Sequence, residues 1–187
     1  ISEEVLDGIR ELVTIGVGHS AGMLNDLTNA HVTLTVPEVR INEITPETML
    51  TVSNLGMIPG DTSQILLSFT GECSGSLSLI IPHKSAINLV ILLTGEDSSP
   101  DEMDALRVET LLEVGNIIIS SVMSSFSILL SSRLLFKFPS YYTGKGLIEG
   151  QMSKTKPEIA ILAQTQFEVQ KKTIEGNILF LLTRSSF

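Results

Sequence analysis

The sequence has no tryptophan, one cysteine and only 5% aromatic residues among 187. A single cysteine can form neither an internal disulfide nor a cysteine-based metal cluster, so a reducing, cytoplasmic setting is expected. Cys73 falls in an expected strand, where a small buried side chain is a better interpretation than a nucleophile. Because aromatics are scarce, the core is expected to be aliphatic, and length and composition suit a single domain spanning residues 1–187.

Basic residues are also scarce, with 12 Lys and Arg against 21 Asp and Glu and a net charge of −9. Residues 1–100 hold 12 acids and 3 bases, whereas residues 101–187 hold 9 of each. Nucleic acids and anionic membranes are bound by clusters of Lys and Arg, so neither is expected as a partner. Apolar runs such as Ala86–Leu93 are too short to cross a bilayer, and a soluble protein is expected.

Two related copies of one pattern follow each other along the chain, which predicts a pseudo-two-fold domain with repeats of about 1–97 and 98–187. Four pairs of positions are each 102 residues apart: Asp7 and Glu109, Glu11 and Glu113, Thr14 and Asn116, Pro37 and Pro139. A β-like stretch follows in each copy, around Phe69 in the first and Phe167 in the second.

Each copy is expected to open with a long helix followed by a strand. In the first, Ser2 caps a helix that reaches Leu27, and the strand His31–Val36 ends at Pro37. Glycines at 16, 18 and 22 lie inside this helix, where close packing or a kink is a better interpretation than a phosphate-binding loop.

The second helix has the stronger start signal. Ser99 as N-cap, Pro100 at the first position and Glu102 at the third form a capping box, from which a helix runs to about Ser131. The strand Leu134–Phe138 then ends at Pro139.

The remaining segments predict two hairpins, one short helix and an irregular connection. These are Gln64–Glu72 with Gly75–Ile81, Glu158–Val169 with Lys172–Leu182, the helix His83–Leu93 capped by Gly95, and the connection Arg40–Thr62. The fold class expected is α/β (α+β), with two long helices packed against a sheet of about six strands.

Glu109, Glu113 and Asn116 have the spacing i, i+4 and i+7, which places them on one face of the second helix. Two acids at this spacing repel each other, and Gly115 and Asn116 are poor helix formers. A strong helix that keeps such residues calls for a functional explanation. The alternative is an ordinary solvated face.

The pattern Glu109-x3-Glu113-x2-Asn116-x22-Pro139 resembles the signature of the CheC, CheX and FliY phosphatase family. Asp7, Glu11, Thr14 and Pro37 repeat its spacing, and the segments 16–21, 36–39 and 71–75 are also similar to this family. Two copies without a further flagellar-switch domain favour CheC.

The resemblance implies hydrolysis of the aspartyl phosphate of a CheY-like response regulator. Asn116 would orient the attacking water and Glu113 would hold the regulator's active-site lysine, while the regulator supplies Mg²⁺ and the chain needs no cofactor of its own. Gln orients water in other phosphoryl transfers, and the Asn amide can likewise both donate and accept.

Two positions depart from the family pattern. Thr14 replaces the Asn of the first copy, and its short hydroxyl cannot reproduce a carboxamide. The possible additional site of the first copy, Glu11 and Thr14, is therefore expected to be weak or inactive. Glu109 stands where the family usually has Asp or Ser. The alternative function is a catalytically weak adaptor that binds a response regulator or a CheD-type deamidase.

Metal and nucleophile chemistry find little support in the sequence. His19, His31 and His83 are scattered and show no metal-ligand spacing, so each is better interpreted as a structural histidine. Nothing marks any serine as a nucleophile.

Overall fold

The computed structural model describes residues 3–28, 30–45, 60–71, 74–95, 102–130, 134–145 and 156–183. Their helices and strands are α1 (Glu3–Thr28), β1 (Val32–Glu43), β2 (Thr62–Gly71), β3 (Ser74–Pro82), α3 (His83–Thr94), α4 (Ala105–Leu130), β4 (Leu134–Phe136), β5 (Ser140–Gly144), β6 (Ile159–Val169) and β7 (Lys172–Thr183). The expectations for Ser2, Cys73, Ser99, Pro100 and Ser131 lie outside the described residues.

The strands form one antiparallel sheet in the order β1-β6-β7-β3-β2-β4, and β5 also pairs with β2. The α+β class, both hairpins and the short helix ending at Gly95 are confirmed. The sheet has seven strands instead of about six, because the chain around Pro139 divides into β4 and β5.

The pseudo-two-fold repeat extends to the element boundaries. Helices α1 and α4 both have 26 residues, and their bounds differ by the same 102 positions as the motif residues. Strand β1 pairs with β6 at one edge of the sheet, while β4 and β5 pair with β2 at the other. Exchanging the two copies therefore reverses the strand order and reproduces the same sheet.

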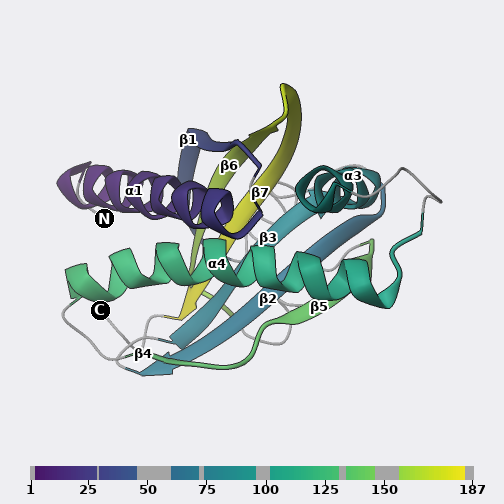
Figure 1. The fold of residues 1–187 in the computed structure, drawn as a ribbon. Helices are drawn as coiled ribbons and strands as arrows, with labels where there is room; N and C mark the ends of the chain where they lie inside the picture. The colour runs from purple at the N-terminus through teal and green to yellow at the C-terminus, as the bar shows by residue number, and fades with distance from the viewer. Residues whose placement is uncertain are drawn as a thin grey trace.

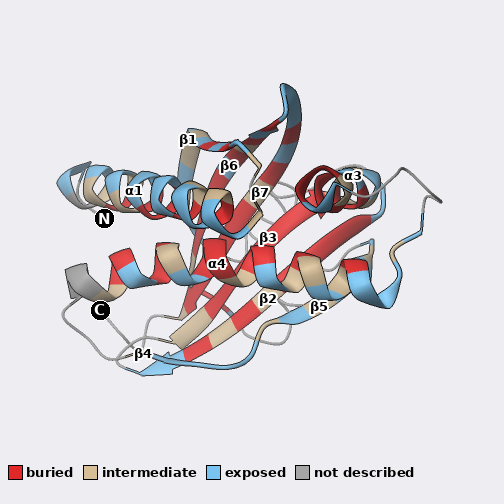
Figure 2. Ribbon diagram, in the orientation of Figure 1, coloured by how far each residue is buried: buried red, intermediate tan, exposed pale blue. Residues whose placement is uncertain are grey.

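All three helices cover one face of the sheet, with α1 and α4 side by side and running in opposite directions (Figure 1). The core lies between the helices and the sheet, and much of β2, β3 and β7 is buried there (Figure 2). Phe69, Phe167 and Phe180 are almost fully buried in this core. Phe69 and Phe167 are the equivalent positions expected from the sequence, and the ring of Phe126 on α4 lies 4.9 Å from that of Phe180. Both copies thus contribute to a single core.

The backbones of α1 and α4 are in close contact at Gly16. A Cβ atom at Gly16 would lie 2.6 Å from Cα of Val122, whereas one at Gly18 or Gly22 would meet nothing within 4 Å. The close-packing interpretation is therefore confirmed for Gly16 and is wrong for the other two.

The two motif prolines interrupt edge strands without ending them. Strand β1 continues past Pro37 to Glu43, with a register shift between Thr35 and Glu38, so the expected strand end and part of the irregular connection are wrong. An edge strand tolerates proline because one side of its backbone needs no partner. The strand expected to reach Phe138 stops at Phe136, and β5 resumes directly after Pro139.

The expected capping box of α4 is also wrong. Glu102 precedes the helix, which begins at Ala105. Oδ1 of Asp104 instead accepts a hydrogen bond of 2.9 Å from the backbone N–H of Arg107, which is the geometry of an N-cap. The Arg107 guanidinium donates to the Glu102 carbonyl at 2.6 Å, and this fixes the entry of the chain into α4.

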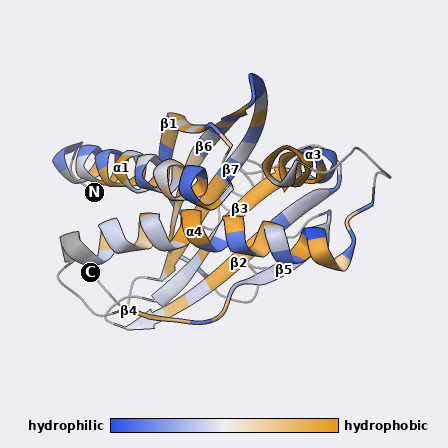
Figure 3. Ribbon diagram, viewed as in Figure 1, coloured by the Kyte–Doolittle hydropathy of each residue, from blue (hydrophilic) through white to orange (hydrophobic). Residues whose placement is uncertain are grey.

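The window Ala105–Ser127 of α4 is long and apolar enough to cross a membrane by length and composition. The sequence alone predicts only apolar runs too short to do so. In this fold 56% of that window is buried inside the protein, and apolar and polar segments alternate along the helix (Figure 3). Helix α4 is therefore a core helix of the domain.

Candidate functional site

The second motif copy lies on the outward face of α4, as the sequence predicts. Glu109 and Glu113 are exposed and Asn116 is half-buried. The orientation is set by Gly115, whose absent Cβ would lie 2.8 Å from side-chain carbons of Ile65 on β2. Gly115 is thus required for the close contact between helix and sheet, so it needs no catalytic explanation.

A hollow of about 490 Å³ opens beside Asn116. One wall is α4 and the other is the segment that connects β4 to β5, so Asn116 and Pro139 line it together across the 22-residue spacing of the motif. The remaining lining residues are Leu67, Ser120, Met123, Ser124, Ser127, Phe136, Lys137 and Phe138. The amide therefore faces an accessible space with a basic and an aromatic rim.

Two residues of this hollow were not identified from the sequence. Ser120 donates a hydrogen bond of 3.3 Å from its hydroxyl to Oδ1 of Asn116, one helical turn away. Phe138 is 95% exposed, because the chain leaves the sheet between β4 and β5. The i+4 spacing from Asn116 could have indicated Ser120, whereas the exposure of Phe138 depends on where β4 ends.

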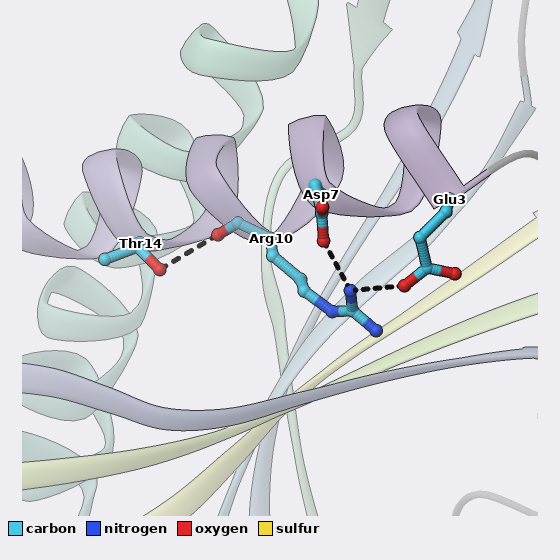
Figure 4. A network of polar contacts seen from close by, with 4 residues as sticks. All are labelled: Glu3, Asp7, Arg10 and Thr14. Carbon is cyan, nitrogen blue, oxygen red and sulfur yellow. Dashed lines mark hydrogen bonds and ion pairs between the residues drawn. The ribbon is translucent and has the colours of Figure 1, made fainter.

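Side chains of the first motif copy bond to Arg10 of their own helix (Figure 4). The Arg10 guanidinium contacts the carboxylate of Asp7 at 2.6 Å and that of Glu3 at 3.4 Å, and its bond to Asp7 raises the pKa of Arg10. The Thr14 hydroxyl donates to the Arg10 carbonyl at 2.9 Å. Asp7, Glu11 and Thr14 nevertheless all lie at exposed positions of α1.

The two prolines occupy different surroundings. Pro37 lines a hollow of about 240 Å³ with residues of β3, β6 and β7, in contrast to Pro139, which lines the hollow beside Asn116. The structure therefore assembles amide and proline around one space in the second copy only. The position equivalent to Arg10 is Leu112, so the second copy also differs in the side chain beside its first acid.

A third hollow, of about 660 Å³, lies between α1 and α4. It is lined by Leu12, Ile15, His19 and Met23 of α1 and by Ser120, Ser121, Ser124 and Ser125 of α4. Ser120 and Ser124 line both hollows, so the two spaces meet along this face of α4.

His83 has structural surroundings, as expected, whereas His19 and His31 are exposed. Nδ1 of His83 lies 2.9 Å from Oγ of Ser63 and 3.3 Å from Oγ1 of Thr143, and the Ser63 hydroxyl also contacts the Tyr141 hydroxyl at 3.0 Å. Ser63 is fully buried, which excludes it as a nucleophile for an outside substrate. Within the described part of the chain, His, Cys, Asp and Glu form no group of three that could hold a metal.

The chain is similar to known proteins in sequence and in fold. No family model matches the sequence. The chain is 26% identical to the CheY-P phosphatase CheC of Bacillus subtilis strain 168, over all of this chain and 92% of that protein.

Solved structures share the fold. FliY of Thermotoga maritima matches 96% of this chain and 90% of its own, with a TM-score of 0.76 and 19% identity. The structure of the CheX–CheY–BeF₃–Mg²⁺ complex from Borrelia burgdorferi matches 96% and 97%, with a TM-score of 0.55 and 14% identity. These likenesses show that the chain has the fold of these chemotaxis proteins. The chain is similar in sequence to a curated CheC, and it shares its fold with solved structures of FliY and CheX.

Proposed function

We propose that this chain hydrolyses the aspartyl phosphate of a CheY-like response regulator, with Asn116 and Glu113 as its catalytic residues. The observation that carries the proposal is the position of both side chains on the outward face of α4, where Glu113 is exposed and the half-buried Asn116 lines an open hollow. The homologue from Bacillus subtilis is a CheY-P phosphatase, which supports the same assignment.

The proposed reaction adds water to the phosphorus atom of the aspartyl phosphate. The water oxygen forms a new P–O bond, the bond to the aspartate oxygen breaks, and the products are the free carboxylate and inorganic phosphate, which retains the protons of the water. Phosphoryl transfer depends mainly on positioning and electrostatics. The Asn116 carboxamide can accept a hydrogen bond from the water and hold the water molecule in line with the breaking bond.

Glu113 is the residue proposed to dock the regulator. Its exposed carboxylate lies one turn before Asn116 and is suited to an ion pair with a lysine of the regulator's phosphorylation site. Mg²⁺ is proposed to come with the regulator, so this chain contributes no metal ligand. We further propose a cytoplasmic protein whose residues 1–187 form one domain, built from repeats of about 1–97 and 98–187.

The second candidate is an adaptor that binds a response regulator, or a CheD-type deamidase, without turnover. The first copy favours it, because Asp7 and Thr14, although exposed, form hydrogen bonds with Arg10 of their own helix. The two candidates differ in one measurable property, which is hydrolysis.

The test uses a CheY-type regulator phosphorylated with acetyl phosphate in the presence of Mg²⁺. Asn116→Ala and Glu113→Ala should each slow dephosphorylation on the order of 100-fold, as when a positioned catalytic hydrogen bond is removed. Folding should be unaffected because both positions lie on the outer face. Gly22→Ala is the control, since a Cβ there meets nothing within 4 Å and the residue lies outside the motif.

Wild-type rates in either motif variant would refute the catalytic assignment. A wild-type chain that binds the phosphorylated regulator but does not speed phosphate loss would establish the adaptor instead.

A further inference from the structure

We propose that Ser120 is a positioning residue that fixes the Asn116 carboxamide for its work on water, and that Gly18 leaves the first copy without this support. The inference rests on the proposed phosphatase function and adds a residue outside the motif. Ser120 acts through Asn116 and needs no contact with the reacting atoms.

The choice of hydrogen-bond partner distinguishes Ser120 from other helical hydroxyls of this protein. Serine and threonine in helices usually donate to the backbone carbonyl four residues earlier. The residues that do so here are Thr14, Thr28, Thr94, Thr110 and Ser125. Ser120 instead donates at 3.3 Å to the side-chain oxygen of the residue four positions earlier, Asn116.

This bond addresses a weakness of asparagine as a water-orienting group. The terminal torsion of asparagine is broad, so a partly exposed amide samples many orientations and can exchange the places of Oδ1 and Nδ2. A hydroxyl donor on Oδ1 favours one orientation. It occupies one of two acceptor sites on the oxygen and leaves the other for a hydrogen of water.

The location of Ser120 agrees with this role. It lines the hollow beside Asn116, at the place where that hollow meets the one between α1 and α4. Ser120 is also exposed, so replacing it by alanine leaves no buried polar group without a partner. A loss of activity in that variant would not be a consequence of unfolding.

The first copy lacks both members of the pair. Thr14 corresponds to Asn116, and Gly18 corresponds to Ser120 by the same 102-residue offset. A Cβ at Gly18 would meet nothing within 4 Å, so packing does not require glycine at this position. The first site therefore differs from the second in two functional positions, not in Thr14 alone.

The first experiment measures dephosphorylation of a CheY-type regulator phosphorylated with acetyl phosphate in Mg²⁺. Ser120→Ala should lower kcat by about 3- to 10-fold, the value of one hydrogen bond of ordinary strength, with KM unchanged. Ser120→Thr should retain most of the rate. Thr110→Ala is the matched control, because it removes a hydroxyl of α4 that bonds only to backbone in this structure.

Two results would overturn the role. One is a Ser120→Ala rate equal to wild type, and the other is a similar loss when Ser120→Ala is added to Asn116→Ala, where no carboxamide remains to be positioned. The side-chain amide signals of Asn116 in ¹H–¹⁵N spectra of the chain alone provide a readout without catalysis. They should shift in Ser120→Ala and not in Thr110→Ala, and unchanged signals overturn the proposal whether or not the wild type is a phosphatase.

The second experiment rebuilds the first copy in an Asn116→Ala background. Thr14→Asn restores the amide, and Thr14→Asn with Gly18→Ser restores its partner as well. The double replacement should be about 3- to 10-fold faster than Thr14→Asn alone. Equal rates, including no recovery in either, would overturn the extension to Gly18.

Discussion

Replacing Gly16 by alanine tests the close contact that holds α1 against α4. The added Cβ would lie 2.6 Å from Cα of Val122, 3.1 Å from its backbone nitrogen and 3.2 Å from the carbonyl oxygen of Ser121. Carbon atoms prefer separations of about 3.5–4.0 Å, so the gap to Cα is short by roughly 1 Å. All three neighbours are backbone atoms of a core helix, and none can rotate away.

The expected magnitude is a balance of two terms. Overpacking of this kind costs about 1–3 kcal/mol, and alanine in place of glycine within a helix returns about 0.5–1 kcal/mol. Gly16→Ala should therefore lower the free energy of unfolding by up to about 2.5 kcal/mol, and most where the backbone of α4 cannot shift. Gly18→Ala, two residues along the same helix with nothing within 4 Å, should raise it by about 0.5–1 kcal/mol.

Urea unfolding followed by circular dichroism measures both variants. The midpoints should move in opposite directions at unchanged m-value, which reports a change in stability without a change in compactness. Equal midpoints for the two alanine variants would refute the reasoning, since the helix-propensity gain is common to both and only the contact with α4 differs.

Two further predictions concern local interactions away from the site. Asp104→Ala should destabilise the protein by about 1 kcal/mol by removing the N-cap of α4, while Asp104→Ser should retain most of the stability; equal denaturation midpoints for the two variants would contradict this. The Arg40 guanidinium, which bonds both carboxylate oxygens of Glu38 at 2.6 and 2.9 Å, lowers the pKa of Glu38. A carboxylate whose pKa is lower in the folded state stabilises the fold at pH above its unfolded-state pKa. This stabilisation is lost as the pH falls through its folded-state pKa. Arg40→Met should thus raise the pKa of Glu38 in a ¹³C titration and destabilise at neutral but not at acid pH, and an unchanged pKa would count against the pairing.

The sequence predicts the regular elements of this fold well where the hydrophobic periodicity and the turn or capping residues agree. Both hairpins and α3 were placed within about two residues, because alternating apolar residues and Gly95 mark them locally. The start of α4 was misplaced because two adjacent capping signals compete, and the choice of Asp104 depends on how Arg107 contacts the chain before the helix. From the sequence alone the two motif prolines predict strand ends. Only the pairing of their strands with a neighbouring strand reveals that the chain continues past them.

The candidate site can likewise be predicted from the sequence only in part. Helical spacing alone places Glu113 and Asn116 on one face, and the structure confirms that this face is turned outward. The reason for Gly115 could not be deduced, because its neighbour Ile65 comes from a strand fifty residues earlier in the chain. Ser120 has a local spacing signal, but serines surround it on α4, and only the hydrogen bond to Asn116 distinguishes it from them.

The contrast between the two copies follows from where their residues lie. Phe69 and Phe167 are equivalent, and both are buried in one shared core, where truncation of an aromatic side chain costs about 3–5 kcal/mol. Thr14 and Asn116 are also equivalent but lie on outward helix faces, where substitutions usually change stability by less than about 0.5 kcal/mol. The first copy can therefore lose its amide without losing its fold. It must nevertheless keep Gly16, because a Cβ at that position would lie 2.6 Å from Cα of Val122 on the neighbouring helix α4.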